Sequence, residues 1–165
     1  LVSFLSDHLA ILEQEKDMLL KKYYSENVEE CMNVEDFFRE YKNTITDFIN
    51  SSQLNSLSYE GFPFVIIRSI VEVQDMNDLE TYQYYIIPPF SKKTDMNIDC
   101  ASCLSPLGKA LLLKSVDQHV DVQIPAGKLQ YMVKKIIIPG MINPISGKTL
   151  DISENMHLNN LSLSV

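Results

Sequence analysis

The sequence predicts an α+β protein in which an antiparallel α-helical hairpin, of the coiled-coil type, precedes a small antiparallel β-sheet domain with one short helix. Two observations lead to this prediction. In the first 50 residues, apolar side chains recur at steps of three and four, which is the period of a helix. After residue 62, apolar and polar residues alternate in short runs between turn-forming residues, which is the pattern of half-buried strands.

Two apolar stripes define the predicted hairpin, which spans residues 1–52. The stripes meet when the helices pack antiparallel, with residues 25–32 joining them and Asn33 capping the second helix. Lys16 fills one position of the first stripe, and His8 is expected on the surface. In an alternative arrangement, both helices lie flat on the sheet domain. The first stripe consists of Val2, Leu5, Leu9, Leu12, Leu19 and Tyr23, and the second of Val34, Phe38, Tyr41, Ile45 and Phe48.

The rest of the chain divides by composition. Small polar residues over 53–61 predict a linker, and the sheet domain is expected over 62–139. Its first strands are expected over 64–73 and 80–87, followed by a third strand, the short helix and a final hairpin. Residues 140–165 hold too few apolar side chains for a core, so they are expected to form a C-terminal extension.

The most informative pattern is Ser-Pro-Leu-Gly-Lys-Ala-Leu-Leu over residues 105–112. Ser105 is a good N-cap because its hydroxyl can accept a hydrogen bond from an amide of the first turn. Pro106 suits the first helical position, where its missing N–H costs nothing. A tight Pro-Ala-Gly turn at residues 125–127 then joins two strands of alternating pattern.

These motifs make residues 62–138 resemble the C-terminal domain of the bacterial GreA/GreB transcript-cleavage factors. The resemblance implies an FKBP-like sheet domain and RNA polymerase as the partner. In the family, a Ser-Pro loop of this domain docks on the rim of the polymerase secondary channel, and the helical hairpin enters that channel. The residues at the matching positions here are Ser105, Pro106, Leu107 and Gly108.

In the same family, acidic side chains at the hairpin tip help to hold a polymerase magnesium ion, a metal that prefers oxygen ligands. The expected tip of this chain carries Glu26, Glu29 and Glu30, but Tyr23 stands where the family has an essential aspartate. Helices of about 20 and 17 residues would give arms roughly 25–30 Å long, shorter than those of the cleavage factors. Both departures resemble the short-armed Rnk-like relatives, which bind polymerase without cleaving transcripts.

Composition and charge argue against several functions. The net charge is −8, and the first 60 residues hold 5 Lys or Arg against 12 Asp or Glu. Direct nucleic-acid binding is therefore not expected, although an acidic helical face can also be merely solvated. Cys100 and Cys103 form a single C-x-x-C with no second pair for zinc, and Cys103 is expected to pack inward.

No Gly-rich phosphate loop or histidine cluster appears in the sequence. We therefore expect no catalytic residue, cofactor or metal, and no enzyme activity. No apolar run approaches the length of about 20 residues that spans a bilayer, and no secretory signal is evident. The chain is therefore expected to be cytoplasmic, with no membrane partner.

The leading functional hypothesis is a regulator of transcription elongation that docks at the polymerase secondary channel and inserts its acidic hairpin. An alternative retains transcript cleavage, with the tip glutamates replacing the usual carboxylates. A further alternative is an interaction module unrelated to polymerase, in which the helical seam forms a homodimer.

Overall fold

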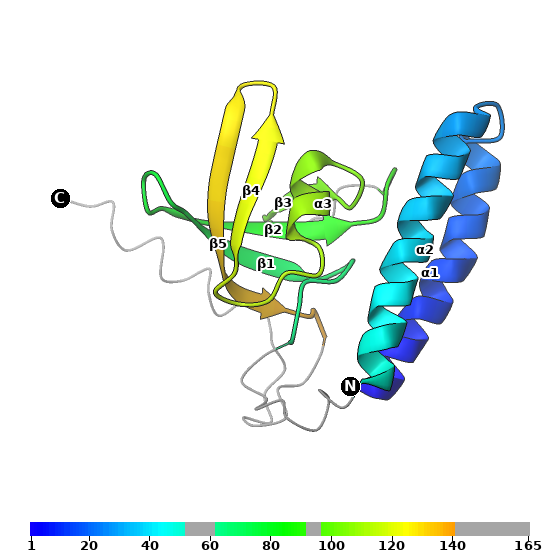
Figure 1. Cartoon of the computed structure of the whole chain (residues 1–165), viewed down its shortest axis with the longest axis horizontal. Helices are drawn as coiled ribbons and strands as arrows, with labels where there is room; N and C mark the ends of the chain where they lie inside the picture. Colours follow the sequence, from blue (N-terminus) through cyan, green and yellow to red (C-terminus); the bar gives the residue numbers. More distant parts are fainter. Residues whose placement is uncertain (52–61, 92–96, 141–165) are drawn as a thin grey trace. The chain divides into compact units, whose positions relative to one another are not determined.

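A computed structural model describes residues 1–51, 62–91 and 97–140, shown in colour in Figure 1. The chain divides into two compact units, Leu1–Leu57 and Ser58–Val165. The predicted linker, residues 53–61, and all of the predicted C-terminal extension after residue 140 lie outside the described residues. None of the helices described is long and apolar enough to cross a membrane.

The first unit is a pair of long helices, α1 (Val2–Tyr23) and α2 (Val28–Asn50), which pack together along their length (Figure 1). The predicted cap at Asn33 is wrong, because α2 begins six residues earlier than that cap would imply. Asn27 is the N-cap, and its side chain accepts a hydrogen bond from the Glu30 amide at 3.1 Å. The acidic residues that follow, Glu29 and Glu30, favour this start because they lie at the positive end of the helix dipole.

The seam between the helices follows the predicted stripes in part. In α2 the second stripe is confirmed, with four members buried and Phe48 half-buried. In α1 the buried face is rotated, so that Val2 and Tyr23 at the helix ends are exposed. The buried seam residues are Leu5, His8, Leu12 and Leu20 of α1 and Val34, Phe38, Tyr41 and Ile45 of α2.

His8 corrects the expectation of a surface position, because only 7% of the residue is exposed. Its Nε2 atom lies 2.9 Å from the hydroxyl of Tyr41 on the other helix. A buried imidazole is tolerated in an apolar seam when a partner takes up its hydrogen-bonding capacity. The pair therefore forms a polar cross-link inside the hairpin.

The second unit is a five-stranded sheet with the strand order β3-β2-β1-β5-β4. The fold class is confirmed, but the sheet is not wholly antiparallel, because β3 pairs with β2 in parallel. The chain returns after Pro88 and Pro89 to the level of Tyr84 before β3 begins, and a parallel pair requires such a long connection. The elements are β1 (Ile70–Asp75), β2 (Thr81–Ile87), β3 (Asp99–Ser102), α3 (Pro106–Leu111), β4 (His119–Ile124) and β5 (Gly127–Ile137).

One face of the sheet forms the core of this unit. The short helix α3 contacts β3 and β4, the two edge strands, so the sheet curls around it. The two edges approach each other across α3 because the sheet is strongly twisted, as sheets of this size commonly are. The inward-facing buried residues include Val71, Val73, Ile86, Val120, Val122 and Val133, together with Leu111 of α3.

The first predicted strand begins later than expected. Residues 64–69 are buried but irregular, and β1 starts only at Ile70. The Ser69 hydroxyl donates to the Ile66 carbonyl at 2.6 Å, and Arg68 adopts a positive φ of 70°. This local turn keeps residues 64–69 out of the strand that begins at Ile70. The apolar run over these residues therefore reflects burial and not strand geometry.

Candidate docking loop and hairpin tip

The predicted docking loop is fixed by hydrogen bonds that converge on Ser105, the N-cap of α3. The Ser105 hydroxyl accepts from the Gly108 amide at 3.0 Å and donates to the Ser102 carbonyl at 2.7 Å. The Ser105 amide donates to the same carbonyl at 2.9 Å. Serine suits this position because a single hydroxyl group can donate and accept at once.

The close packing of α3 explains why the motif contains a glycine, Gly108, three residues after the cap. A Cβ atom at this position would lie 2.0 Å from the Ser102 carbonyl oxygen and 3.0 Å from the Cys103 Cα. Both atoms belong to the backbone and cannot move aside cheaply. Gly108 therefore lets the first turn of α3 pack directly on the end of β3.

The four predicted docking residues divide into two kinds. Pro106 is exposed and Leu107 is half-buried, so both contribute surface, whereas Gly108 is buried and Ser105 is half-buried beneath the turn. Pro106 also has a restricted backbone, and the turn before it is closed by hydrogen bonds. Such a preformed apolar corner loses little conformational entropy when a partner binds.

The two cysteines beside this loop have structural positions. Cys103 is fully buried, and burial raises the pKa of its thiol to about 12. It lies one residue past β3, and its amide donates to the Ile87 carbonyl at 2.8 Å. Cys100 is half-buried. Across the described part of the chain, no three His, Cys, Asp or Glu side chains gather closely enough to hold a metal ion.

The predicted acidic residues all lie at one end of the hairpin. Glu26 is in the connection between the helices, and Glu29 and Glu30 are in the first turn of α2. All three are exposed. The positive end of the helix dipole stabilises the charges of Glu29 and Glu30, and Asn27 caps the same turn. These glutamates therefore also help α2 to begin at this position.

The same end of the hairpin exposes apolar side chains, which the sequence did not predict to lie at the surface. Tyr23, Val28 and Met32 are 45%, 71% and 58% exposed. Tyr23 had been assigned to the seam by its spacing, but the stripe ends at Leu20. The sequence did not predict this exposure, because Tyr23 was placed in the seam and the start of α2 was placed too late.

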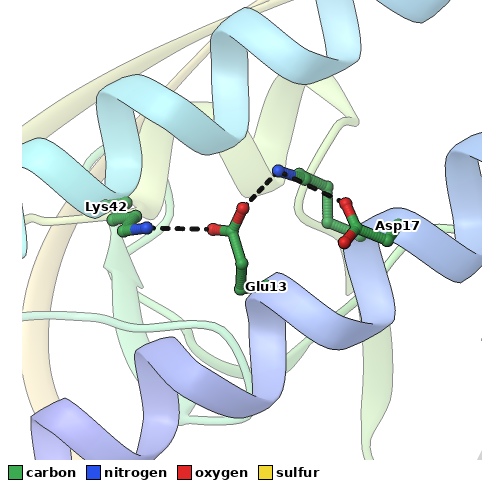
Figure 2. Close-up of polar contacts among 4 residues, drawn as sticks. Glu13, Asp17 and Lys42 are labelled. Atoms are coloured by element: carbon green, nitrogen blue, oxygen red, sulfur yellow. Dashed lines mark hydrogen bonds and ion pairs between the residues drawn. The ribbon is translucent and has the colours of Figure 1, made fainter.

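Midway along the hairpin, charged side chains link the two helices (Figure 2). Glu13 of α1 accepts from Lys42 of α2 at 3.2 Å and from Lys16 at 2.5 Å, and Lys16 also lies 3.6 Å from Asp17. The hydrogen bond from Lys16 holds the pKa of the Glu13 carboxyl below its usual value. Lys16 occupies the seam as predicted, with only 17% of its side chain exposed.

Residues 62–138 match the family model described as "Transcription elongation factor, GreA/GreB, C-term". The matched residues include every strand of the sheet unit, which is therefore similar to the GreA/GreB C-terminal domain. This domain contains the Ser105–Gly108 turn, and the resemblance inferred from the sequence is confirmed for it. The match ends at residue 138, one residue beyond β5.

Curated relatives support the same assignment. The chain is 36% identical over 75 residues to transcription elongation factor GreA of Chlorobium phaeovibrioides, which covers 45% of this chain and 46% of that protein. It is 38% identical over 72 residues to transcription elongation factor GreB of Xanthomonas axonopodis pv. citri, covering 44% and 42%. The chain thus spans less than half the length of the curated relatives it matches. Both relatives are named as transcription elongation factors.

Solved structures that align with this chain include two of GreA factor homolog 1, Gfh1. The protein of Thermus thermophilus aligns over 82% of this chain and 93% of that chain, with 20% identity and a TM-score of 0.40. The protein of Thermus aquaticus aligns over 82% and 88%, with 23% identity and a TM-score of 0.41.

Proposed function

We propose that this chain is a regulator of transcription elongation that binds RNA polymerase without catalysing a reaction itself. In this proposal the GreA/GreB C-terminal domain docks at the rim of the polymerase secondary channel, and the acidic hairpin enters the channel. The match of residues 62–138 to that domain is the observation that carries the proposal.

The shape of the docking loop supports this role. Pro106 and Leu107 form an apolar corner on the surface, and the Ser105 hydrogen bonds hold that corner in one conformation. The close approach of Gly108 to the backbone at the end of β3 further limits the movement of this corner. The rigid corner is therefore suited to making the same contact each time.

The hairpin supports the second part of the proposal. Its helices have 22 and 23 residues, which correspond to arms of about 33–35 Å at 1.5 Å per residue. The second arm is longer than the sequence predicted, because α2 starts after Asn27. The tip carries three exposed glutamates, so a narrow and negatively charged element is available for insertion.

Binding to purified bacterial core RNA polymerase tests the proposal. The wild-type chain is expected to co-purify with the polymerase at micromolar concentration. Pro106→Arg is expected to weaken binding at least tenfold, because it places a charged side chain on the apolar corner. Pro125→Arg is the matched control, since Pro125 is another exposed proline, in the β4–β5 turn. No binding by the wild-type chain would refute the proposal.

Stimulation of transcript cleavage is a second candidate, favoured by the gathering of Glu26, Glu29 and Glu30 at one end of the hairpin. Carboxylates at that place are suitable ligands for a shared, partly hydrated Mg²⁺. If it is correct, backtracked polymerase complexes will shorten their transcripts when the chain is added. A triple Glu→Gln variant at the tip should abolish the effect, whereas Glu40→Gln on the shaft should not. Binding without cleavage would leave the first proposal alone.

A further inference from the structure

Three tyrosines lie together on the inward face of the sheet. Tyr82 and Tyr84 of β2 contact Tyr131 of β5, with ring centroids 6.4 and 6.2 Å apart and interplanar angles of 65° and 60°. The hydroxyls of Tyr84 and Tyr131 are 3.3 Å apart. We call these residues the tyrosine floor. Their rings meet across β1, whose Val71 and Val73 pair with Tyr84 and Tyr82.

The tyrosine floor is only partly covered. Tyr131 is 4% exposed, but Tyr82 and Tyr84 are half-buried, although they share the inward face with the fully buried Ile86. The difference follows from the position of α3, which lies beyond the end of β3 and contacts β3 and β4. Aromatic area at the start of β2 is therefore left accessible to a partner.

Carboxylates border this aromatic surface. The Tyr82 hydroxyl donates to Glu80 at 3.0 Å and lies 3.4 Å from Asp78. On the other side, Asp99 is the register partner of Tyr84 in β3. The negative charge of Asp99 contributes, after burial and the Tyr131 hydrogen bond, to raising the pKa of Tyr84. The hydrogen bond to Glu80 raises the pKa of Tyr82 to about 12.

These three carboxylates are exposed, and in the described ranges of the chain no lysine or arginine forms an ion pair with any of them. Asp121 on β4 is different, because Lys128 neutralises it at 2.9 Å. A hydrogen bond from a neutral phenol does not remove the charge of a carboxylate. Among the residues that the structure describes, the border of the tyrosine floor is therefore negative and not neutralised by an ion pair.

We infer that the tyrosine floor binds an arginine or lysine side chain from a basic segment of a protein partner. Electron-rich ring faces attract cations placed within about 6 Å of the ring centroid. The bordering carboxylates add charge-assisted hydrogen bonds, and a guanidinium group also stacks on aromatic rings. The tyrosines would then have two roles, since they also cover Val71 and Val73 of the core. This inference does not depend on the identity of the polymerase as partner.

Nuclear magnetic resonance titration of the full chain tests this inference. The probe is acetyl-Gly-Arg-Gly-Arg-Gly-amide, and its matched control replaces arginine by glutamate. Resonances of residues 82–84 and Tyr131 are expected to shift and saturate at millimolar arginine peptide. The glutamate peptide is expected to leave them unchanged. Equal shifts around Asp121, or no shift at 20 mM arginine peptide, would overturn the inference.

Variants separate binding from a purely structural role of the rings. Tyr84→Leu is expected to weaken binding at least fivefold, whereas Tyr84→Phe, which keeps the ring, is expected to bind within twofold of the wild type. If Tyr84→Leu does not fold, Asp78→Asn combined with Glu80→Gln and Asp99→Asn provides the test, because all three positions are exposed. That triple variant should lose binding, and Asp121→Asn should not. Unchanged binding by the triple variant would refute the inference.

Discussion

The docking loop and the hairpin tip both begin a helix with a capping side chain, but they are built differently. Ser105 and Asn27 each accept from the amide three residues later, at 3.0 and 3.1 Å. Around Ser105, the hydroxyl also binds Ser102, and Gly108 packs against the backbone of β3. Around Asn27, the neighbouring side chains are exposed.

This difference shows what each region can tolerate. The docking loop depends on backbone contacts that permit only a few residue types, so its shape and its sequence are coupled. At the tip, the Asn27 side chain caps α2 through a hydrogen bond within one helical turn, and the exposed side chains around it can change without disturbing the fold. A surface whose shape depends on backbone contacts can therefore be recognised by a strong sequence motif. A solvated tip has only a weak motif.

The largest expected effect is at Gly108. Gly108→Ala places a Cβ atom 2.0 Å from the Ser102 carbonyl oxygen, so α3 must shift away from β3. We expect a loss of about 2–4 kcal/mol in the free energy of unfolding, measured by urea denaturation. Gly127→Ala is the control: its φ of 136° is unfavourable but nothing lies within 4 Å, so about 1 kcal/mol is expected. Equal losses would show that the backbone contact is unimportant.

The next effect concerns the buried seam between α1 and α2, which holds the two arms of the hairpin together. Tyr41→Phe removes the hydroxyl that lies 2.9 Å from the His8 Nε2 atom in a buried position. We expect a loss of about 1–2 kcal/mol, because a polar group loses a buried partner. Thermal unfolding followed by circular dichroism measures it. The double variant His8→Leu/Tyr41→Phe should recover part of the loss, and strict additivity would contradict this account.

A smaller effect tests the start of α2. Asn27→Ala removes the cap and is expected to cost about 1 kcal/mol. Asn33→Ala, at the position that the sequence had suggested as the cap, should have almost no effect, because Asn33 is exposed within the helix. Chemical denaturation of the two variants compares them directly. A larger loss at Asn33 would restore the sequence-based boundary.

The smallest effect is the pH dependence of the Glu13 network. Lys16 lowers the pKa of Glu13 in the folded state. Its contribution is therefore complete above the unfolded pKa, near 4.5, and is lost as the pH falls through the lower folded value. Because 42% of the Glu13 side chain is exposed, we expect only a few tenths of a kcal/mol. Comparison of wild type with Glu13→Gln at pH 7 and pH 3 measures it, and a difference that grows on acidification would contradict this sign.

Much of the sheet unit could be predicted from the sequence. Ser105, Pro106 and Gly108 each have a local chemical reason for their position, and the structure uses all three. The parallel pairing of β3 could not be predicted, because a short strand after a long connection carries no signal of its direction. The convergence of Tyr82, Tyr84 and Tyr131 was also missed, since it depends on the order of β2, β1 and β5 in the sheet.

The hairpin was harder to predict at its tip than along its shaft. The stripe of α2 was readable because its apolar spacing is regular, but Asn27 and Asn33 give the same local capping signal. His8 was misplaced because the sequence does not show that Tyr41 faces it. The error at His8 concerns a contact between residues far apart in the chain, which periodicity does not encode, whereas the error at the cap is a choice between two equivalent local signals.

The irregularity in β5 constrains how the sheet unit can vary in length. The pairing of β1 with β5 shifts between Glu72 and Val73, so that Lys134 and Lys135 are both exposed while Val133 and Ile136 are both buried. Removing one lysine would remove this extra residue and leave Val133 and Ile136 two positions apart, still on the same face, whereas removing both would direct Ile136 towards water. Substitution of these lysines or loss of one of them is therefore compatible with the register of the sheet, whereas loss of both is not.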